Sequence, residues 1–197
     1  MLAVAALHVL LAGLFVLLYL RAVGLAAMPA LFGGVGFAFS GWVAAHLHNT
    51  QLVATVVWIP LGLWAIERSM QDGRMRGRCG VAMATTLAMM ATAGFAQFAV
   101  LGTATLVVYA ACSWLARRRL SALRPLGGLL LAATLGALLA APQLLTTFEF
   151  LPRAARGSRT VPDLQSERYR PGAWVGLVLP RALGDPMSAA PWQTQGL

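Results

Sequence analysis

The stretch Leu2–Leu20, with the sequence LAVAALHVLLAGLFVLLYL, decides the class of fold to expect. Apart from His8, it holds no residue that carries charge near neutral pH. An apolar run of this length spans the hydrocarbon core of a membrane as a helix. A signal peptide would carry basic residues before the run, whereas here the charge, Arg21, follows it. We therefore predict a membrane-spanning helix.

The composition of the whole chain supports a membrane protein. Hydrophobic residues make up 59% of the 197 residues, and charged residues only 11%. Soluble domains carry roughly 25% charged residues, and a soluble core of this size cannot bury so much apolar surface. The composition excludes a soluble globular enzyme, a disordered chain and a collagen-like fibre. The two cysteines, Cys79 and Cys112, lack a metal-ligand spacing and are expected to be packing residues.

Further apolar runs follow the first, separated by short polar or charged stretches. The predicted fold is an all-α, polytopic transmembrane helical bundle within residues 1–150. About six helices are expected, at residues 2–20, 25–45, 52–66, 79–95, 98–115 and 126–145. Residues 151–197 are polar and rich in proline, so we expect a mostly irregular, extracytoplasmic segment.

The distribution of arginine predicts the topology. The net charge is +9, and every basic residue is Arg. Arginines cluster around residues 21, 68–78 and 117–124, whereas the turns 46–51 and 96–97 hold none. The positive-inside rule places the arginine-rich loops in the cytoplasm, with both termini and the 46–51 turn outside a bacterial inner membrane. Membrane lipid is the expected partner, and nucleic acid is not, because no recognition motif accompanies the charge.

A polar turn at residues 46–51 allows two interpretations. The pair His46 and His48 resembles a metal-ligand spacing, but a zinc site needs more ligands, so no metal site is predicted. The turn is either an interfacial connection, with Asn49 or Thr50 capping the next helix, or the lining of a functional site.

Three more polar residues are expected at the same membrane face. Gln97 lies between two predicted helices, where an amide can satisfy freed backbone groups. Gln143 and Glu149 lie near the end of the last predicted helix. Alternating helices bring all these positions to one side, so we expect them to share a polar cleft with His46. The motifs GxSxG, GxGxxG and the P-loop are absent from the sequence.

An ordered series of short motifs resembles the YfhO family of bacterial polytopic membrane proteins, which is related to the GT-C glycosyltransferase superfamily. The series comprises Phe37–Gly41, Ala45-His46, Asn49, Trp58–Leu61, Glu67-Arg68, Ala93-Gly94, Gln97, Pro142–Leu145, Glu149, Leu151, Ser158-Arg159, Tyr169, Pro171, Leu179-Pro180 and Gly184. Two positions depart from the family pattern. Phe95-Ala96 stands where the family often has His-Pro, which weakens an acid–base role for this turn, and Thr146 stands where Pro is common.

The resemblance implies a function on the outer face of the membrane. A GT-C-like enzyme would transfer a sugar from a polyprenyl-phosphate donor to a cell-envelope glycopolymer or lipid. Arg159 would pair with the donor phosphate, or else be a solvated loop charge. The substrate-binding candidates are His46, His48, Asn49, Gln97, Gln143, Glu149 and Arg159.

Family members are several times longer and carry an acidic outward loop near their start that has no counterpart here. We therefore expect an internal fragment that is inactive alone, with its catalytic residue unknown. No cofactor is evident, although a divalent metal is possible in a full-length protein. The alternative function is a non-catalytic membrane protein, either a scaffold or assembly partner or a portion of a transporter.

Overall fold

The computed structural model describes residues 2–75, 77–117, 124–150 and 152, and this part of the chain is helical, without strands. Its eight helices are α1 (Leu2–Val23), α2 (Ala27–Ala38), α3 (Gly41–His46), α4 (Thr50–Val56), α5 (Ile59–Gln71), α6 (Gly77–Thr92), α7 (Ala96–Arg117) and α8 (Arg124–Phe150). Of the predicted C-terminal segment, residues 151–197, only Pro152 is described. Arg159 therefore lies outside the described residues.

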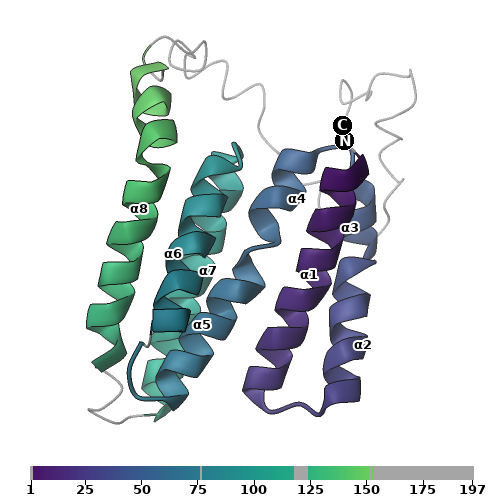
Figure 1. Ribbon diagram of the computed structural model, residues 1–197, viewed down its shortest axis with the longest axis vertical. Helices are drawn as coiled ribbons and strands as arrows, with labels where there is room; N and C mark the ends of the chain where they lie inside the picture. Colours follow the sequence, from purple (N-terminus) through teal and green to yellow (C-terminus); the bar gives the residue numbers. More distant parts are fainter. Residues whose placement is uncertain (1, 76, 118–123, 151, 153–197) are drawn as a thin grey trace, which may run out of the picture. The chain divides into compact units, whose positions relative to one another are not determined.

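Five helical stretches are long and apolar enough to cross a membrane (Figure 1). They are Ala3–Val23, Ala27–His46, Thr50–Gln71, Ala96–Arg117 and Gly127–Phe150. The helix α6 has 16 residues, which is short for a full span of about 20 residues. The helices belong to one compact unit, Met1–Glu149, and a second unit begins at Phe150. The prediction of an all-α helical membrane bundle is confirmed, and the chain is a multi-pass membrane protein.

Two of the expected helices are each broken into two pieces. At the end of α2 the backbone leaves the helix, and the Ser40 hydroxyl accepts a hydrogen bond from the Val43 N–H at 3.4 Å to cap α3. The break between α4 and α5 lies at Val57 and Trp58, just before Pro60, which has no N–H to continue the upstream helix. Apolar residues run through both breaks, so the sequence predicted single helices there.

The helices alternate in direction, so their connections gather at two ends of the unit (Figure 1). We call one the arginine end, defined by the described side chains of Arg21, Arg68, Arg74, Arg78 and Arg117. We call the other the histidine end, defined by residues 40–51 and 93–98. The turns at the two ends contain Gly24, Gly73 and Gly94, whose positive φ angles suit glycine.

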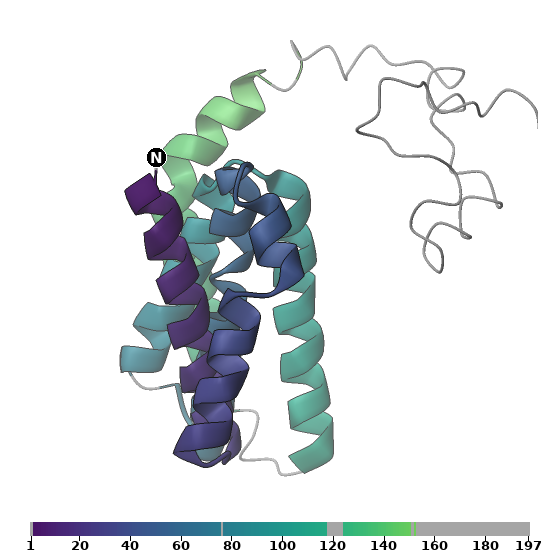
Figure 2. The same ribbon diagram turned by 90° about the vertical axis from the view of Figure 1, so that its right-hand side faces the viewer.

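Small residues let the helices approach closely. The helices α1 and α2 lie side by side (Figure 2). A Cβ atom added to Gly34 of α2 would lie 2.6 Å from the Gly13 carbonyl oxygen of α1, so these two backbones touch. The helix α8 carries small residues every four positions: Gly128, Ala132, Gly136 and Ala140. A Cβ atom added to Gly136 would lie 2.9 Å from the Ala84 carbonyl oxygen of α6, whereas Gly128 lies against Met75, just before α6. In lipid, van der Waals contact of this kind replaces the hydrophobic effect as the force between helices.

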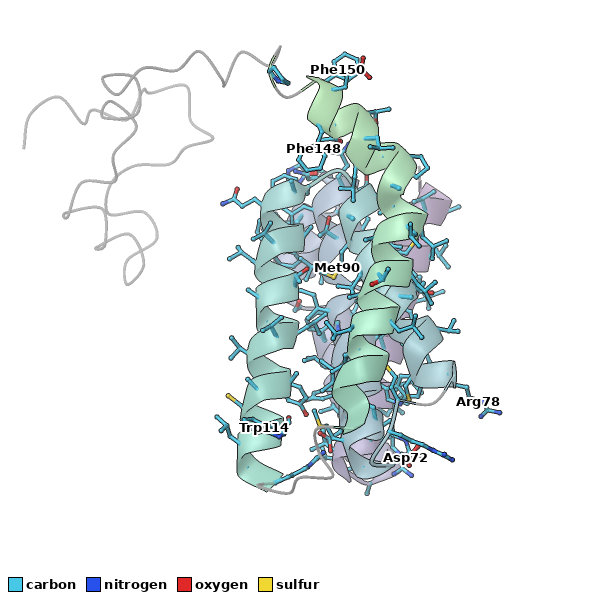
Figure 3. All side chains as sticks on the ribbon, turned by 90° about the vertical axis from the view of Figure 1, so that its left-hand side faces the viewer. Asp72, Arg78, Met90, Trp114, Phe148 and Phe150 are labelled. Atoms are coloured by element: carbon cyan, nitrogen blue, oxygen red, sulfur yellow. The ribbon has the colours of Figure 1, made fainter. Side chains whose placement is uncertain are left out.

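The buried core joins α5, α6, α7 and α8. Its fully enclosed members are Ala65, Ile66, Met70, Cys79, Met83, Ala84, Leu106 and Ala132. Outside the core, large apolar side chains such as Leu130 and Leu139 are exposed on the surface of the bundle. Phe148, which is also exposed, is labelled on α8 in Figure 3. A soluble protein rarely exposes so much apolar surface, whereas lipid tails cover it at no cost.

Candidate functional site

The histidine end carries a stack of aromatic rings on the short helix α3 and the turn that follows it. The rings of Trp42 and His46 stack with centroids 4.6 Å apart, and the His48 ring follows at 6.4 Å from His46. His46 follows Trp42 by four positions in the sequence, which is about one helical turn, so both side chains lie on one face of the helix. The Trp42 ring also lies 6.4 Å from the Phe98 ring of α7. The two polar turns of this end are therefore joined by aromatic contact.

A hydrogen bond to the backbone determines which ring nitrogen of His46 carries the hydrogen. Its Nδ1 lies 2.8 Å from the Trp42 carbonyl oxygen. A carbonyl oxygen only accepts, so Nδ1 carries the hydrogen, and in the neutral ring Nε2 keeps its lone pair. The imidazole is partly exposed. His46 is thus positioned to accept a hydrogen bond from a hydroxyl group through Nε2.

The turn after His46 meets the turn between α6 and α7. Asn49 occupies the position before α4, but its side chain makes no capping hydrogen bond. The Gln51 amide lies beside Gly94, where an added Cβ would be 3.6 Å from Nε2 of Gln51. The two turns are therefore in contact at this point, and the positive φ angle of Gly94 favours glycine there. The Asn49 amide keeps its hydrogen-bonding capacity for another group.

The other predicted site residues are placed less closely together. Gln97 is exposed in the first turn of α7, and Gln143 and Glu149 are exposed on α8. Among the described residues, no hydrogen bond or ring contact joins these three side chains to His46 or to one another. The Gln143 carbonyl oxygen, rather than its amide, accepts from the hydroxyls of Thr146 and Thr147. Arg159 lies outside the described part of the chain.

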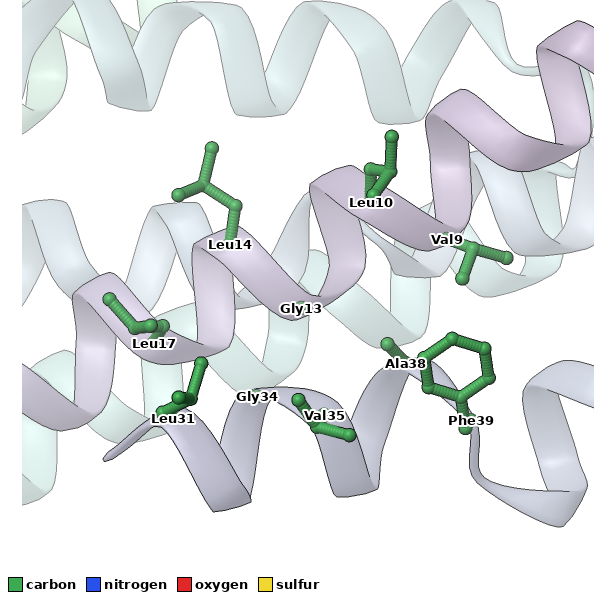
Figure 4. A pocket seen from close by; sticks show the side chains of 10 residues that line it. All are labelled: Val9, Leu10, Gly13, Leu14, Leu17, Leu31, Gly34, Val35, Ala38 and Phe39. Carbon is green, nitrogen blue, oxygen red and sulfur yellow. The ribbon is translucent and has the colours of Figure 1, made fainter. Parts of the chain in front are cut away.

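Within the residues that the structure describes, no three His, Cys, Asp or Glu side chains lie close enough together to hold a metal ion. A hollow of about 260 Å³ lies between α1 and α2 and is lined by apolar side chains including Leu14, Leu17 and Phe39 (Figure 4). This hollow lies away from the expected polar cleft and opens over the contact of Gly13 with Gly34.

A second polar cluster, at the arginine end, was missed by sequence reasoning. Glu67 is only 6% exposed, and its carboxylate accepts hydrogen bonds from three side chains. The donors are Arg117 Nη2 at 2.6 Å, the Tyr109 hydroxyl at 2.9 Å and Gln71 Nε2 at 2.9 Å. Gln71 also donates to the Ala22 carbonyl oxygen at 2.7 Å. The cluster thereby ties α1, α5 and α7 together.

The sequence placed Glu67 in a charged linker after residue 66, whereas α5 continues to Gln71 and buries it. A signal was present: Gln71 follows Glu67 by one helical turn, and Arg117 closes a later apolar run. Charge alone does not reveal burial, because a carboxylate with three donors can be enclosed.

Comparison with known proteins gives no identification. No family model matches the chain, and neither a curated protein nor a solved structure matches it.

Proposed function

We propose that the chain belongs to a YfhO-like, GT-C-like membrane protein of the bacterial cytoplasmic membrane, and that its histidine end binds the sugar of a polyprenyl-phosphate donor. The sugar would pass to a cell-envelope glycopolymer or lipid on the outer face. Two features support the proposal. One is the ordered motif series, and the other is the stack of Trp42, His46 and His48 beside Asn49, whose side chain makes no capping hydrogen bond.

The single observation that carries the proposal is this ring stack. Sugar rings present apolar C–H faces and polar hydroxyl edges, so they suit an aromatic face placed beside hydrogen-bonding groups. Trp42 is 36% exposed and offers such a face. The lone pair of His46 Nε2 and the Asn49 amide provide hydrogen-bonding groups at the same end. Gln97, Gln143 and Glu149 would join the site only through a ligand or water.

The proposed orientation follows from the arginines. The arginine end faces the cytoplasm, and the histidine end, with residues 46–51, faces outward. In this orientation the donor phosphate lies at the outer headgroup level, where Arg159 is proposed to pair with it.

Donor binding tests the proposal directly. The purified chain in lipid nanodiscs is titrated with a polyprenyl-phosphate sugar and, as a control, with the sugar-free polyprenyl phosphate. We expect the sugar-linked donor to bind more tightly, and Trp42→Ala and His46→Ala to remove that preference. Equal affinities for the two lipids in the unmodified chain would overturn the sugar-binding role. In a full-length homologous protein, alanine at the positions of His46 or Arg159 should lower transfer while membrane insertion stays intact.

A non-catalytic scaffold is the second candidate, and the closed cluster around Glu67 favours it. Its hydrogen bonds connect α1, α5 and α7, and the Glu67 carboxylate accepts all of its described hydrogen bonds from side chains of this chain. Transporters typically carry ionisable residues near the membrane centre. Within the described spans, Asp, Glu and Arg lie only near helix ends, which disfavours transport. The scaffold role would be supported if the chain bound neither the sugar-linked nor the sugar-free polyprenyl phosphate but co-purified with partner membrane proteins.

A further inference from the structure

Two arginines near the connection between α5 and α6 make no described polar contact within the chain. Arg74 lies in the loop, and Arg78 lies in the first turn of α6; both are exposed. Figure 3 shows Arg78 extending away from the helices. Among the described residues, neither side chain has a hydrogen-bond or ion-pair partner. Their guanidinium groups therefore keep their donors for a group outside the bundle.

The other described arginines at this end are engaged, at least in part, with the chain. Arg21 donates to the Leu25 carbonyl oxygen at 2.8 Å, and Arg68 donates to Gln71 Oε1 at 3.2 Å. Arg117 is bound to Glu67. Among the described arginines of this end, Arg74 and Arg78 are thus the two whose charge is not engaged, and Asp72 is the described acid nearest to them in sequence. Asp72 has an interaction of its own.

The position of the loop in the membrane identifies the chemistry of its partner. The apolar span Thr50–Gln71 ends just before the loop, so Arg74 and Arg78 lie where a bilayer has its phosphate groups. Guanidinium groups bind phosphate oxygens through two parallel hydrogen bonds. Trp114 and Leu115 on the neighbouring helix α7 are apolar and exposed, which suits contact with lipid at this depth.

From these observations we infer that Arg74 and Arg78 form a docking surface for the phosphate headgroup of an anionic phospholipid. The inference does not depend on the proposed sugar-binding function, because it concerns the opposite end of the unit. Lipid bound here would neutralise the arginine end and hold the loop between α5 and α6 at the headgroup level.

Lipid titration monitored by native mass spectrometry tests the inference on the full chain in neutral detergent. Phosphatidylglycerol is compared with phosphatidylcholine, and Arg74→Gln/Arg78→Gln with the unmodified chain. We expect the double variant to bind phosphatidylglycerol about 30-fold more weakly. The matched control, Arg21→Gln/Arg68→Gln, removes the same charge from two arginines that already donate within the chain, and it should stay within twofold of the unmodified chain.

Salt dependence and competition with inorganic phosphate also test the docking surface. Raising the salt concentration should weaken binding of phosphatidylglycerol by the unmodified chain but leave phosphatidylcholine unaffected, which tests the inference even if the variant misfolds. Equal binding of the two lipids, or an equal loss in the control variant, would overturn the docking surface. Displacement of phosphatidylglycerol by an equal concentration of inorganic phosphate would show a free-phosphate site instead.

Discussion

The two ends of the helical unit use their polar side chains in opposite ways. At the arginine end, Glu67 is buried and accepts hydrogen bonds from three side chains of α5 and α7. At the histidine end, Trp42 and His46 are stacked and partly exposed, and within the described part of the chain the Asn49 side chain makes no capping hydrogen bond. Polar groups satisfied within the chain stabilise the fold, whereas polar groups with free hydrogen-bonding capacity are available to a ligand. The comparison therefore assigns stability to Glu67, and it leaves His46 as the residue at which we propose binding.

The largest effect is expected from removing the buried carboxylate. Glu67→Ala leaves Arg117, Tyr109 and Gln71 without their common acceptor, and Arg117 Nη1 already lacks a partner. Breaking a mostly buried ion pair costs about 3 kcal/mol. Unfolding in neutral detergent, monitored by circular dichroism, measures this loss.

Two control variants accompany this measurement. Arg74→Gln removes an exposed charge from the same end and should change the free energy of unfolding by less than about 0.5 kcal/mol. Glu67→Gln/Arg117→Gln should recover part of the loss, because it removes both charges together. Equal losses for Glu67→Ala and Arg74→Gln would refute the structural role of the cluster.

A smaller loss is expected where α1 and α2 touch. A Cβ atom at Gly34 would lie 2.6 Å from the Gly13 carbonyl oxygen, so Gly34→Ala must push the two helices apart. Overpacking of this kind costs about 2 kcal/mol. Gly36→Ala, two residues further along α2, is the matched control because nothing lies within 4 Å of its Cβ position. The same unfolding measurement should show a loss for Gly34→Ala alone, and equal behaviour of the two variants would contradict the contact.

The smallest effect is expected at the cap that positions the ring stack. Ser40→Ala removes the hydrogen bond to the Val43 N–H and should destabilise α3 by about 1 kcal/mol. Hydrogen exchange of the backbone amides of residues 41–46 should then accelerate about fivefold. Ser40→Asp, which keeps an acceptor at the cap, should restore slow exchange. Unchanged exchange in Ser40→Ala would show that the cap does not hold α3.

The sequence predicted the fold well because long apolar runs are sufficient to indicate spans, as at Leu2–Leu20. It did not predict the breaks at Ser40 and Trp58, because hydropathy continues through both. The alternation of helices correctly brought the turn at His46 close to the turn at Gly94. Burial of Glu67 was not predicted, because it depends on donors from a helix about fifty residues away.

The expected polar cleft shows the limit of reasoning from topology. Alternation places helix ends on the same side, but it does not set the lateral distance between them. Gln143 and Glu149 have no described contact with His46 for this reason, since α8 packs on α6 through Gly136. Their place in the proposed site therefore stays a prediction.

The proposed difference between the ends is tested most directly by the side of the membrane that each one faces. Single cysteines are introduced at Thr50, at the histidine end, and at Arg74, at the arginine end, in a chain whose Cys79 and Cys112 are replaced by alanine. Intact bacteria are treated with a membrane-impermeant maleimide. We predict that Thr50→Cys is labelled in intact cells and that Arg74→Cys is labelled only after permeabilisation. Labelling of Arg74→Cys in intact cells, with Thr50→Cys protected, would contradict the proposal that the histidine end binds a donor outside.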